Sequence, residues 1–312
     1  PFRRELLAHC YRMLGSLHDA EDAVQDTYLR AWRAYDRFEG RSSLRNWLYR
    51  IATNACLRAL ERSGRRPLPS GLGAPSADPE RPLELGPPGL DWLEPLPDAR
   101  LGSGPDDPAA LVASRDSVRL AFVAALQHLP ARQRAVLILR DVLEWRAAEV
   151  AELLGTSAAA VNSALQRARA QLAEVAPAED ELAPPDEPDR RALLDRYVAA
   201  FEDADVAALE RLLRADVELE MPPFAAWFSG REMVRRFFAA QILVEPGRFR
   251  MVLTAANGQP AVLSYLRDRD GVYRPHAVHV LTLTPGGIAR IVVFLDPASV
   301  AAFDPPLSYD SA

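Results

Sequence analysis

The sequence contains no lysine, so arginine supplies all 37 of its basic side chains. Only two cysteines occur, Cys10 and Cys56, with no CxxC pair and no histidine at metal-ligand spacing. A disulfide framework and a zinc site are therefore not expected, and no metal or cofactor is predicted. No apolar run approaches the roughly 18 residues of a membrane span, and the opening PFRRELLAHC predicts no secretory peptide. These absences favour a cytoplasmic protein with no membrane partner.

Charge is distributed unevenly along the 312 residues, whose formal net charge is −6. Residues 1–66 hold 13 arginines against 8 acidic residues, and residues 111–172 hold 8 against 5. Acidic residues dominate 67–110, with 8 against 2 arginines, and 173–190, with 7 against 1. The length predicts two or three domains. Two basic blocks separated and followed by acidic ones indicate nucleic-acid binding, which the overall charge conceals.

Residues 1–66 are predicted to form three helices. In HDAEDAVQDTYLRAWRAY, Asp19 is the expected N-cap, with Asp22 at the fourth position of a capping box. Apolar side chains then recur at three- and four-residue steps and predict one buried stripe: Val24, Thr27, Tyr28, Ala31, Trp32 and Tyr35. The next helix, LRNWLYRIATNACLRALER, has a second stripe: Leu44, Trp47, Leu48, Ile51, Ala52, Ala55 and Ala59. Arg50, Asn54 and Arg58 line a different face of that helix.

The acidic segment 67–110 is dense in proline and glycine, which predicts a linker without a regular element. One apolar island, LDWLEPL, interrupts it and is either a docking point or a stretch that merely samples contact. Helical periodicity returns in 111–173, and 174–189 predicts a second acidic linker.

Residues 190–312 have a different pattern. RRALLDRYVAAFEDADVAALERLL and GREMVRRFFAAQIL predict helices, and VELEM predicts a strand between them. Four more strands are expected in RFRMVLT, AVLSYLRD, AVHVLTLT and IARIVVFLD, with turns at NGQP, RDRDG and PGG. Helices followed by an antiparallel meander predict an α+β domain.

The stretch AELLGTSAAAV has the spacing of a tight helix-turn-helix. Ala151 supplies a small residue where the helices touch, Gly155 tolerates a positive φ at the turn, and Val161 packs back from the second helix. Ser157 or Thr156 is expected to cap that second helix. A helical hairpin that never contacts DNA is the alternative, and the spacing together with the positive charge favours DNA.

With Val161 and Leu165 facing inward, the second helix presents an outward set: Ser157, Ala158, Asn162, Gln166 and Arg167. Asparagine and glutamine side chains read adenine edges, and arginine reads guanine edges or binds phosphate.

Three parts of the chain resemble known families. HDAEDAVQDTYLRAWRAYDRFEGRSSLRNWLYRIATNACLRALERSGRR resembles region 2 of sigma-70 initiation factors of the extracytoplasmic-function (ECF) class. LPARQRAVLILRDVLEWRAAEVAELLGTSAAAVNSALQRARAQL is similar to their region 4. Residues 190–303 resemble the SnoaL-like branch of the nuclear-transport-factor-two-like fold. The resemblance implies a multi-domain protein with two all-α domains, a region 2 bundle and a region 4 helix-turn-helix, followed by an α+β cone.

The resemblance further implies a promoter-specificity subunit that is not an enzyme. Its partners would be core RNA polymerase, through the β′ clamp helices and the β flap, and promoter DNA. The positions that match the clamp-binding helix are Asp22, Gln25, Asp26 and Leu29. Those that match the minus-ten DNA contacts, in and after the loop 39–45, are Arg41, Arg45, Asn46, Trp47, Arg50, Asn54 and Arg58. The outward set of the helix-turn-helix would read the minus-thirty-five element.

Alternatives stay open for some of these residues. Trp47 falls within an apolar stripe, so a core position competes with a role as a base-stacking platform. The row of Arg50, Asn54 and Arg58 is equally compatible with an ordinary solvated helix face.

The cone suggests a cavity lined by Tyr265, His279 and Asp296, with His276 nearby in sequence, that would hold a small-molecule ligand. A lone strand histidine is more often structural, and no acid–base constellation here is strong enough to predict catalysis. We expect the C-terminal domain to regulate activity by packing on the front modules or on the linker. Two alternatives remain: a one-component helix-turn-helix regulator sensing a ligand in its cone, and a cyclase- or isomerase-like enzyme with a DNA-binding front end.

Overall fold

The computed structural model describes residues 2–38, 40, 42–62, 64–102, 117–175 and 186–308. It contains two compact units: unit 1 (Pro1–Arg66 with Asp98–Pro177) and unit 2 (Pro67–Pro97 with Ala178–Ala312). Within the described ranges, no helix has both the length and the apolar character needed to cross a bilayer. Among these same residues, no group of three or more histidine, cysteine, aspartate or glutamate side chains is arranged to hold a metal ion.

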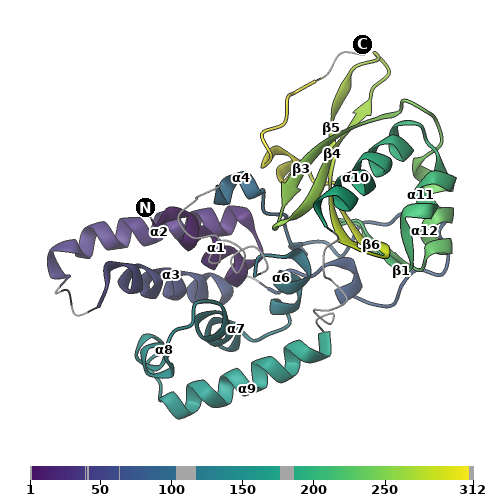
Figure 1. Ribbon diagram of the computed structural model, residues 1–312. Coiled ribbons are helices and arrows are strands. Elements are labelled where there is room, and N and C mark those ends of the chain that lie inside the picture. Colours follow the sequence, from purple (N-terminus) through teal and green to yellow (C-terminus); the bar gives the residue numbers. More distant parts are fainter. Residues whose placement is uncertain are drawn as a thin grey trace. The chain divides into compact units, whose positions relative to one another are not determined.

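The first part of unit 1 is a helical bundle (Figure 1). Its elements are α1 (Arg3–Leu14), α2 (Leu17–Ala34), a 3-10 turn η1 (Tyr35–Arg37) and α3 (Leu44–Leu60). α2 begins where Ser16 Oγ accepts the backbone N–H of Asp19 at 3.1 Å. The predicted cap at Asp19 is therefore wrong, because Asp19 lies in the first turn, where its carboxylate pairs with Arg66 at 2.7 Å.

The buried stripe predicted on α2 is only partly correct. Val24, Thr27 and Ala31 are buried. The three aromatic residues of the stripe are exposed, with exposed fractions of 37% for Tyr28, 84% for Trp32 and 62% for Tyr35. Apolar periodicity marks the helix face that avoids water, but it does not say whether the chain's own core or a partner covers that face.

The second part of unit 1 is also helical. Its elements are α4 (Asp98–Leu101), α6 (Leu120–Leu126), α7 (Ala131–Leu137) continued by the π-helical turn η3 (Ile138–Val142), α8 (Ala147–Leu154) and α9 (Ala158–Val175). Their apolar faces form a core: Val123, Leu126, Leu137, Ile138, Val150, Val161 and Leu165. The helical prediction for this block is correct over residues 120–173, and positions 111–116 lie outside the described residues.

Unit 2 is built on a six-stranded sheet within residues 186–308. Its elements are α10 (Glu187–Glu202), α11 (Val206–Leu212), β1 (Leu213–Glu220), β2 (Trp227–Ser229), α12 (Arg231–Phe237) with the π turn η5 (Phe238–Ile242), β3 (Phe249–Ala256), β4 (Gln259–Arg267), β5 (Tyr273–Thr284), β6 (Gly287–Phe294) and α13 (Pro297–Ala301). The strand order is β2-β1-β6-β5-β4-β3, and only the β1–β6 pair is parallel. α10, α11 and α12 lie over one face of this sheet (Figure 1).

The predicted α+β class and the meander β3–β6 are correct. The sequence did not predict the short strand β2. The single helix expected over 190–213 is divided, because Ala204 adopts a φ of +51° and Asp205 caps α11 by accepting the N–H of Ala208 at 2.8 Å.

Residues 67–97, expected to be a linker without regular structure, pack as part of unit 2. We call Pro67–Pro97 the strap. It contains the 3-10 turn η2 (Pro69–Gly71) and forms isolated bridges at Leu85–Phe224 and Pro97–Ala256. Leu93 and Leu96, from the apolar island, are at most 1% exposed. Because burying a leucine side chain contributes about 1.5–3 kcal/mol, these two residues explain why the segment is docked rather than free. Positions 103–110 of the expected linker lie outside the described residues.

Candidate polymerase and nucleic-acid interfaces

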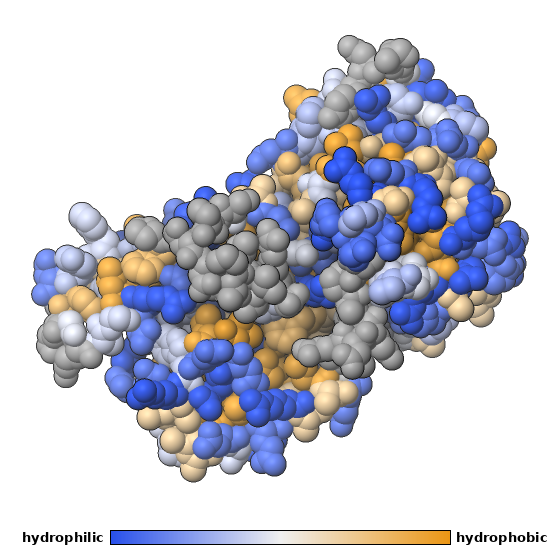
Figure 2. Space-filling view, in the orientation of Figure 1, coloured by the Kyte–Doolittle hydropathy of each residue, from blue (hydrophilic) through white to orange (hydrophobic). Residues whose placement is uncertain are grey.

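The candidate polymerase-binding residues lie along the exposed part of α2. Asp22, Gln25 and Leu29 are exposed, and Leu29 retains 49% of its accessible surface. Asp26 is half-buried and pairs with Arg30 at 2.7 Å. Figure 2 shows apolar side chains among hydrophilic ones at the end of unit 1 where α2 and α3 lie. Trp32 follows Leu29 by three residues and extends the same face.

Trp32 is the residue of this surface that the sequence analysis misassigned. Its four-residue spacing from Tyr28 and three-residue spacing from Tyr35 suggested a place in the buried stripe, yet it is 84% exposed. The exposure of Trp32 could have been predicted from its position three residues after Leu29, because the resemblance assigns Leu29 to the polymerase-binding face.

The candidate minus-ten residues at the start of α3 have local partners. Arg45 donates to Glu5 Oε2 at 2.7 Å, and its guanidinium lies 5.2 Å from the ring centre of Tyr49. Asn46 is half-buried, and its backbone N–H donates to Ser43 Oγ, which caps the helix. Trp47 is also half-buried and packs on Phe38, with ring centroids 4.8 Å apart. Trp47 therefore lies at the edge of the core. This position is compatible with both alternatives, a core residue and a base-stacking platform.

Other minus-ten candidates lie on the outer side of α3. Arg50 and Arg58 are exposed, and Asn54 between them is half-buried. Arg50 donates to Glu152 Oε1 of α8 at 3.1 Å. Arg41 and the loop residue Glu39 lie outside the described residues.

The helix-turn-helix has the geometry predicted from its spacing. α8 ends at Gly155, whose φ of +62° lies in the left-handed region that favours glycine. Ser157 Oγ accepts the N–H of Ala160 at 3.1 Å and caps α9. Val161 and Leu165 are buried, and all members of the outward set are exposed: Ser157, Ala158, Asn162, Gln166 and Arg167.

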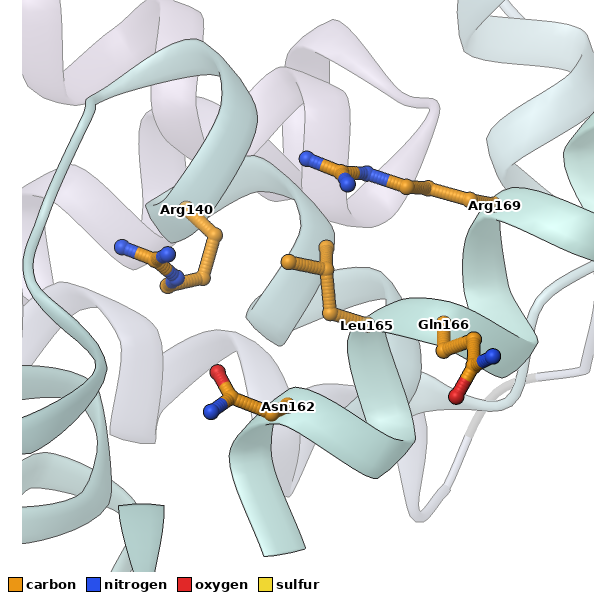
Figure 3. A pocket seen from close by; sticks show the side chains of 5 residues that line it. All are labelled: Arg140, Asn162, Leu165, Gln166 and Arg169. Carbon is orange, nitrogen blue, oxygen red and sulfur yellow. The ribbon is translucent and has the colours of Figure 1, made fainter. Parts of the chain in front are cut away.

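A pocket of about 320 Å³ opens beside α9 and is lined by Arg140, Asn162, Leu165, Gln166 and Arg169 (Figure 3). Arg169 makes a bidentate ion pair with Asp141, at 2.7 and 2.8 Å. Arg140 comes from η3 and donates to the backbone oxygen of Trp145. The sequence analysis missed both arginines. Arg169 follows Gln166 by one helical step of three, so extending the outward set by one turn would have found it.

The three residues predicted to line a cavity in the cone lie at different places in unit 2. His279 is buried in the helix-facing core, where Nδ1 lies 2.9 Å from Tyr197 Oη and Nε2 lies 3.3 Å from Ser264 Oγ. Tyr265 follows Ser264 on β4, so it points to the opposite face of the sheet. Asp296 lies after β6 and caps α13 by accepting the N–H of Ser299 at 2.8 Å. Successive residues of a strand alternate between faces, and the face that residues of two different strands share depends on the register between those strands.

Burial governs the electrostatics of this core. Burial, assisted by the neighbouring His276, lowers the pKa of His279 to about 3. Burial also lowers the pKa of His276 and raises that of Tyr197. Phe201 packs edge-on to His279 with ring centroids 5.2 Å apart, so aromatic side chains surround the imidazole.

Comparison with known proteins gives matches over both helical blocks and the cone. The Sigma-70 region 2 model matches residues 1–66, the Sigma-70 region 4 model matches 119–172, and the SnoaL-like domain model matches 194–291. The ECF RNA polymerase sigma factor SigG of Mycobacterium tuberculosis (strain H37Rv) is 54% identical over 308 residues, which cover 98% of this chain and 82% of SigG. The chain belongs to the ECF sigma factors.

Other relatives agree with this assignment. The ECF sigma factor SigJ of the same strain is 30% identical over 293 residues, or 90% of this chain and 85% of SigJ. The crystal structure of M. tuberculosis SigJ has a TM-score of 0.61 to this ECF sigma factor at 24% identity, covering 98% of this chain and 97% of that one. The predicted fold class, two sigma-factor helical regions and a SnoaL-like α+β domain, is thus correct.

Proposed function

We propose that this ECF sigma factor binds core RNA polymerase through α2 and directs it to promoters through α3 and α9. The observation that carries the proposal is the exposed face of α2, where Asp22, Gln25, Leu29 and Trp32 follow at helical spacing. An indole that is 84% exposed leaves a large apolar area in water, which is typical of a surface that a partner covers. The acidic neighbours favour a basic protein surface, such as the β′ clamp helices, and repel DNA.

Two arginine-bearing helix faces are the proposed promoter contacts. On α3, exposed Arg50 and Arg58 would neutralise the minus-ten strand, while Arg45, Asn46 and Trp47 would meet its unpaired bases. On α9, the outward set would enter the major groove at the minus-thirty-five element. The pocket beside α9 adds Arg140 and Arg169 next to the base-reading amides, which supports a negatively charged ligand such as the DNA backbone.

The C-terminal domain is proposed to modulate activity by holding the strap. Glu220 is fully buried and accepts the backbone N–H of Ser70 at 2.8 Å. Farther along, Trp227 donates to Gly73 O at 2.8 Å and Arg236 pairs with Glu80 at 2.8 Å. Because the strap joins regions 2 and 4 in the sequence, fixing it limits how freely those regions separate.

A catalytic role for the cone has less support. A general acid or base works best with a pKa near the operating pH, whereas that of His279 is about 3. Both of its ring nitrogens already have partners in Tyr197 and Ser264. We therefore propose that the SnoaL-like domain serves transcription without catalytic turnover, and we assign no ligand to its interior.

Run-off transcription with purified bacterial core RNA polymerase and genomic promoter fragments tests this function. The full chain should start transcripts at discrete positions. Asp22→Arg should abolish polymerase binding and leave binding to duplex DNA unchanged, since the substitution lies on the acidic face of α2. Equal loss of both would mean that the helix was misassigned. Absence of polymerase binding by the unaltered chain at low salt would favour the one-component regulator.

A further inference from the structure

Arg45, a proposed contact of the unpaired minus-ten bases, is held from two sides at the start of α3. Its Nε donates to Glu5 Oε2 of α1 at 2.7 Å, and its guanidinium lies 5.2 Å from the ring centre of Tyr49, one helical turn later. Tyr49 Oη donates to the same Glu5 oxygen at 3.2 Å. Glu5 therefore connects the arginine to the aromatic ring on which it packs.

The ring of Tyr49 is a fixed support for this arginine. Tyr49 is 1% exposed, and His9 of α1 packs edge-on to it with ring centroids 5.2 Å apart. His9 Nε2 lies 2.9 Å from Thr53 Oγ1, which donates to the backbone oxygen of Tyr49 at 2.8 Å. Burial raises the pKa of Tyr49 above its usual value, so its hydroxyl stays protonated and donates to Glu5. The ring and the carboxylate thus belong to one connected group that spans α1 and α3.

The outer end of Arg45 remains accessible in this arrangement. The side chain retains 47% of its accessible surface. Among the described residues, Glu5 is the one carboxylate that Arg45 contacts, and the bond uses Nε. A guanidinium has five N–H donors in a rigid plane, so its two terminal nitrogens remain for another ligand. Parallel donors of this kind match two adjacent acceptors, such as those on the edge of a guanine base.

An arginine that is already held recognises a base differently from a mobile one. Immobilising a long side chain on binding weakens affinity by roughly two- to tenfold, and Arg45 avoids that cost because Glu5 and Tyr49 fix it beforehand. The carboxylate also neutralises the charge that would attract any phosphate, and it leaves the directional hydrogen bonds of the terminal nitrogens. Both effects favour recognition of a base over non-specific attraction to the strand.

We propose that Glu5 is a positioning residue for promoter recognition, which together with Tyr49 holds Arg45 so that its terminal nitrogens meet one unpaired base of the minus-ten element. The proposal rests on the proposed function for the assignment of Arg45. Glu5 acts through the arginine and requires no contact with DNA of its own. Loss of Glu5 should therefore weaken the same base preference that loss of Arg45 removes.

Fluorescence anisotropy of the holoenzyme with labelled single strands tests the proposal. The full chain is assembled with core RNA polymerase. The probe is the non-template strand across the minus-ten element of the strongest start site found by run-off transcription, together with its single-base variants. Arg45→Ala should remove the preference at one position. Glu5→Ala should reduce the preference at that same position by roughly two- to tenfold, and the double variant should lose no more than Arg45→Ala alone. Unchanged preference in Glu5→Ala, or a change at a different position, would overturn the proposal.

Glu5→Gln separates positioning from charge and from folding. It removes the same charge as Glu5→Ala but keeps an oxygen that accepts from Nε of Arg45, so it should retain most of the base preference. Both variants should bind a scrambled strand of the same composition at least as tightly as the unaltered chain does, because an arginine that is not neutralised attracts any phosphate. Equal loss of preference in the two variants would show an effect of charge alone and would contradict positioning. Weaker binding of both variants to the specific and the scrambled strand alike would show a loss of structure and would also count against it.

Glu21→Ala is the matched control. It removes one carboxylate from α2 of the same bundle, where Glu21 pairs with Arg3 at 3.5 Å, and it should leave the base preference unchanged. A loss of preference equal to that in Glu5→Ala would overturn the proposal. A preference that depends on Arg45 but not on Glu5 would overturn the positioning role and leave the proposed function intact. Equal binding of the specific and the scrambled strand by the unaltered holoenzyme would count against both.

Discussion

Asn257 binds both backbone polar groups of Leu96. The N–H of Asn257 donates to Leu96 O at 2.8 Å, and its Oδ1 accepts the N–H of Leu96 at 2.9 Å. Asn257 and Gly258 have φ values of +57° and +67°, as a two-residue hairpin turn between β3 and β4 requires. One asparagine thus forms the hairpin and anchors the end of the strap.

Asn257→Gly separates these two roles. Glycine keeps the left-handed turn but leaves the buried N–H of Leu96 without its acceptor, a cost of about 1–3 kcal/mol. Hydrogen exchange measured by mass spectrometry should become faster in residues 93–97, while β3 and β4 retain their protection. Asn257→Asp keeps an acceptor oxygen and should largely preserve the strap. Equal exchange in all three proteins would mean that this contact does not hold it.

Gly86 allows the packing of the middle of the strap to be tested independently of Asn257. Its N–H donates to Pro223 O at 2.9 Å, and a Cβ added there would overlap the ring of Trp92. Gly86→Ala should therefore loosen the strap and increase its cleavage by a glutamate-specific protease at exposed Glu84. Gly73→Ala, where a Cβ would meet nothing within 4 Å, is the control and should be cleaved like the unaltered chain.

Features with a local cause could be predicted from the sequence. Asn257–Gly258 indicates a hairpin, and the positions of Gly155 and Val161 indicate a helix-turn-helix, because each depends on a few neighbouring residues. The strap could not be predicted from its composition, since its order comes from Glu220 and other residues over a hundred positions away. The separation of Tyr265, His279 and Asp296 could not be predicted for the same reason, because the face that each residue occupies depends on the sheet register.

Acid should destabilise unit 2 through His279. Burial lowers its pKa in the folded state to about 3, against about 6.5 when unfolded, so the unfolded state takes up the proton first as the pH falls. The stabilising effect of the neutral imidazole is thus complete above about pH 6.5 and is lost progressively toward pH 3, by a few kcal/mol in total. The free-energy difference of unfolding between wild type and His279→Gln should therefore shrink between pH 7 and 4. A constant difference would contradict this account, and exposed His18→Gln is the control.

Asn162 is expected to read a base rather than the DNA backbone. It is exposed on α9 and lines the pocket that also contains Arg140 and Arg169 (Figure 3). Asn162→Ala should cost about 1–3 kcal/mol on the preferred minus-thirty-five sequence and relax preference at one base pair, with little change in salt dependence. Arg167→Ala would instead weaken binding to all sequences and reduce the salt slope by about 1 if it contacts phosphate. Fluorescence anisotropy with single-base variants of the duplex distinguishes these outcomes.

Trp32 tests whether the exposed face of α2 is the polymerase contact. Because its indole is 84% exposed, Trp32→Ala should change the free energy of unfolding by no more than about 0.5 kcal/mol. An aromatic anchor at the centre of an interface typically contributes about 2 kcal/mol or more, so affinity for core polymerase should fall at least about 30-fold. Duplex binding through α9 should not change, because no interface residue there is altered. Arg33→Ala, the exposed neighbour on α2, is the matched control, and an equal loss of affinity in both variants would point to general charge effects instead of an apolar anchor.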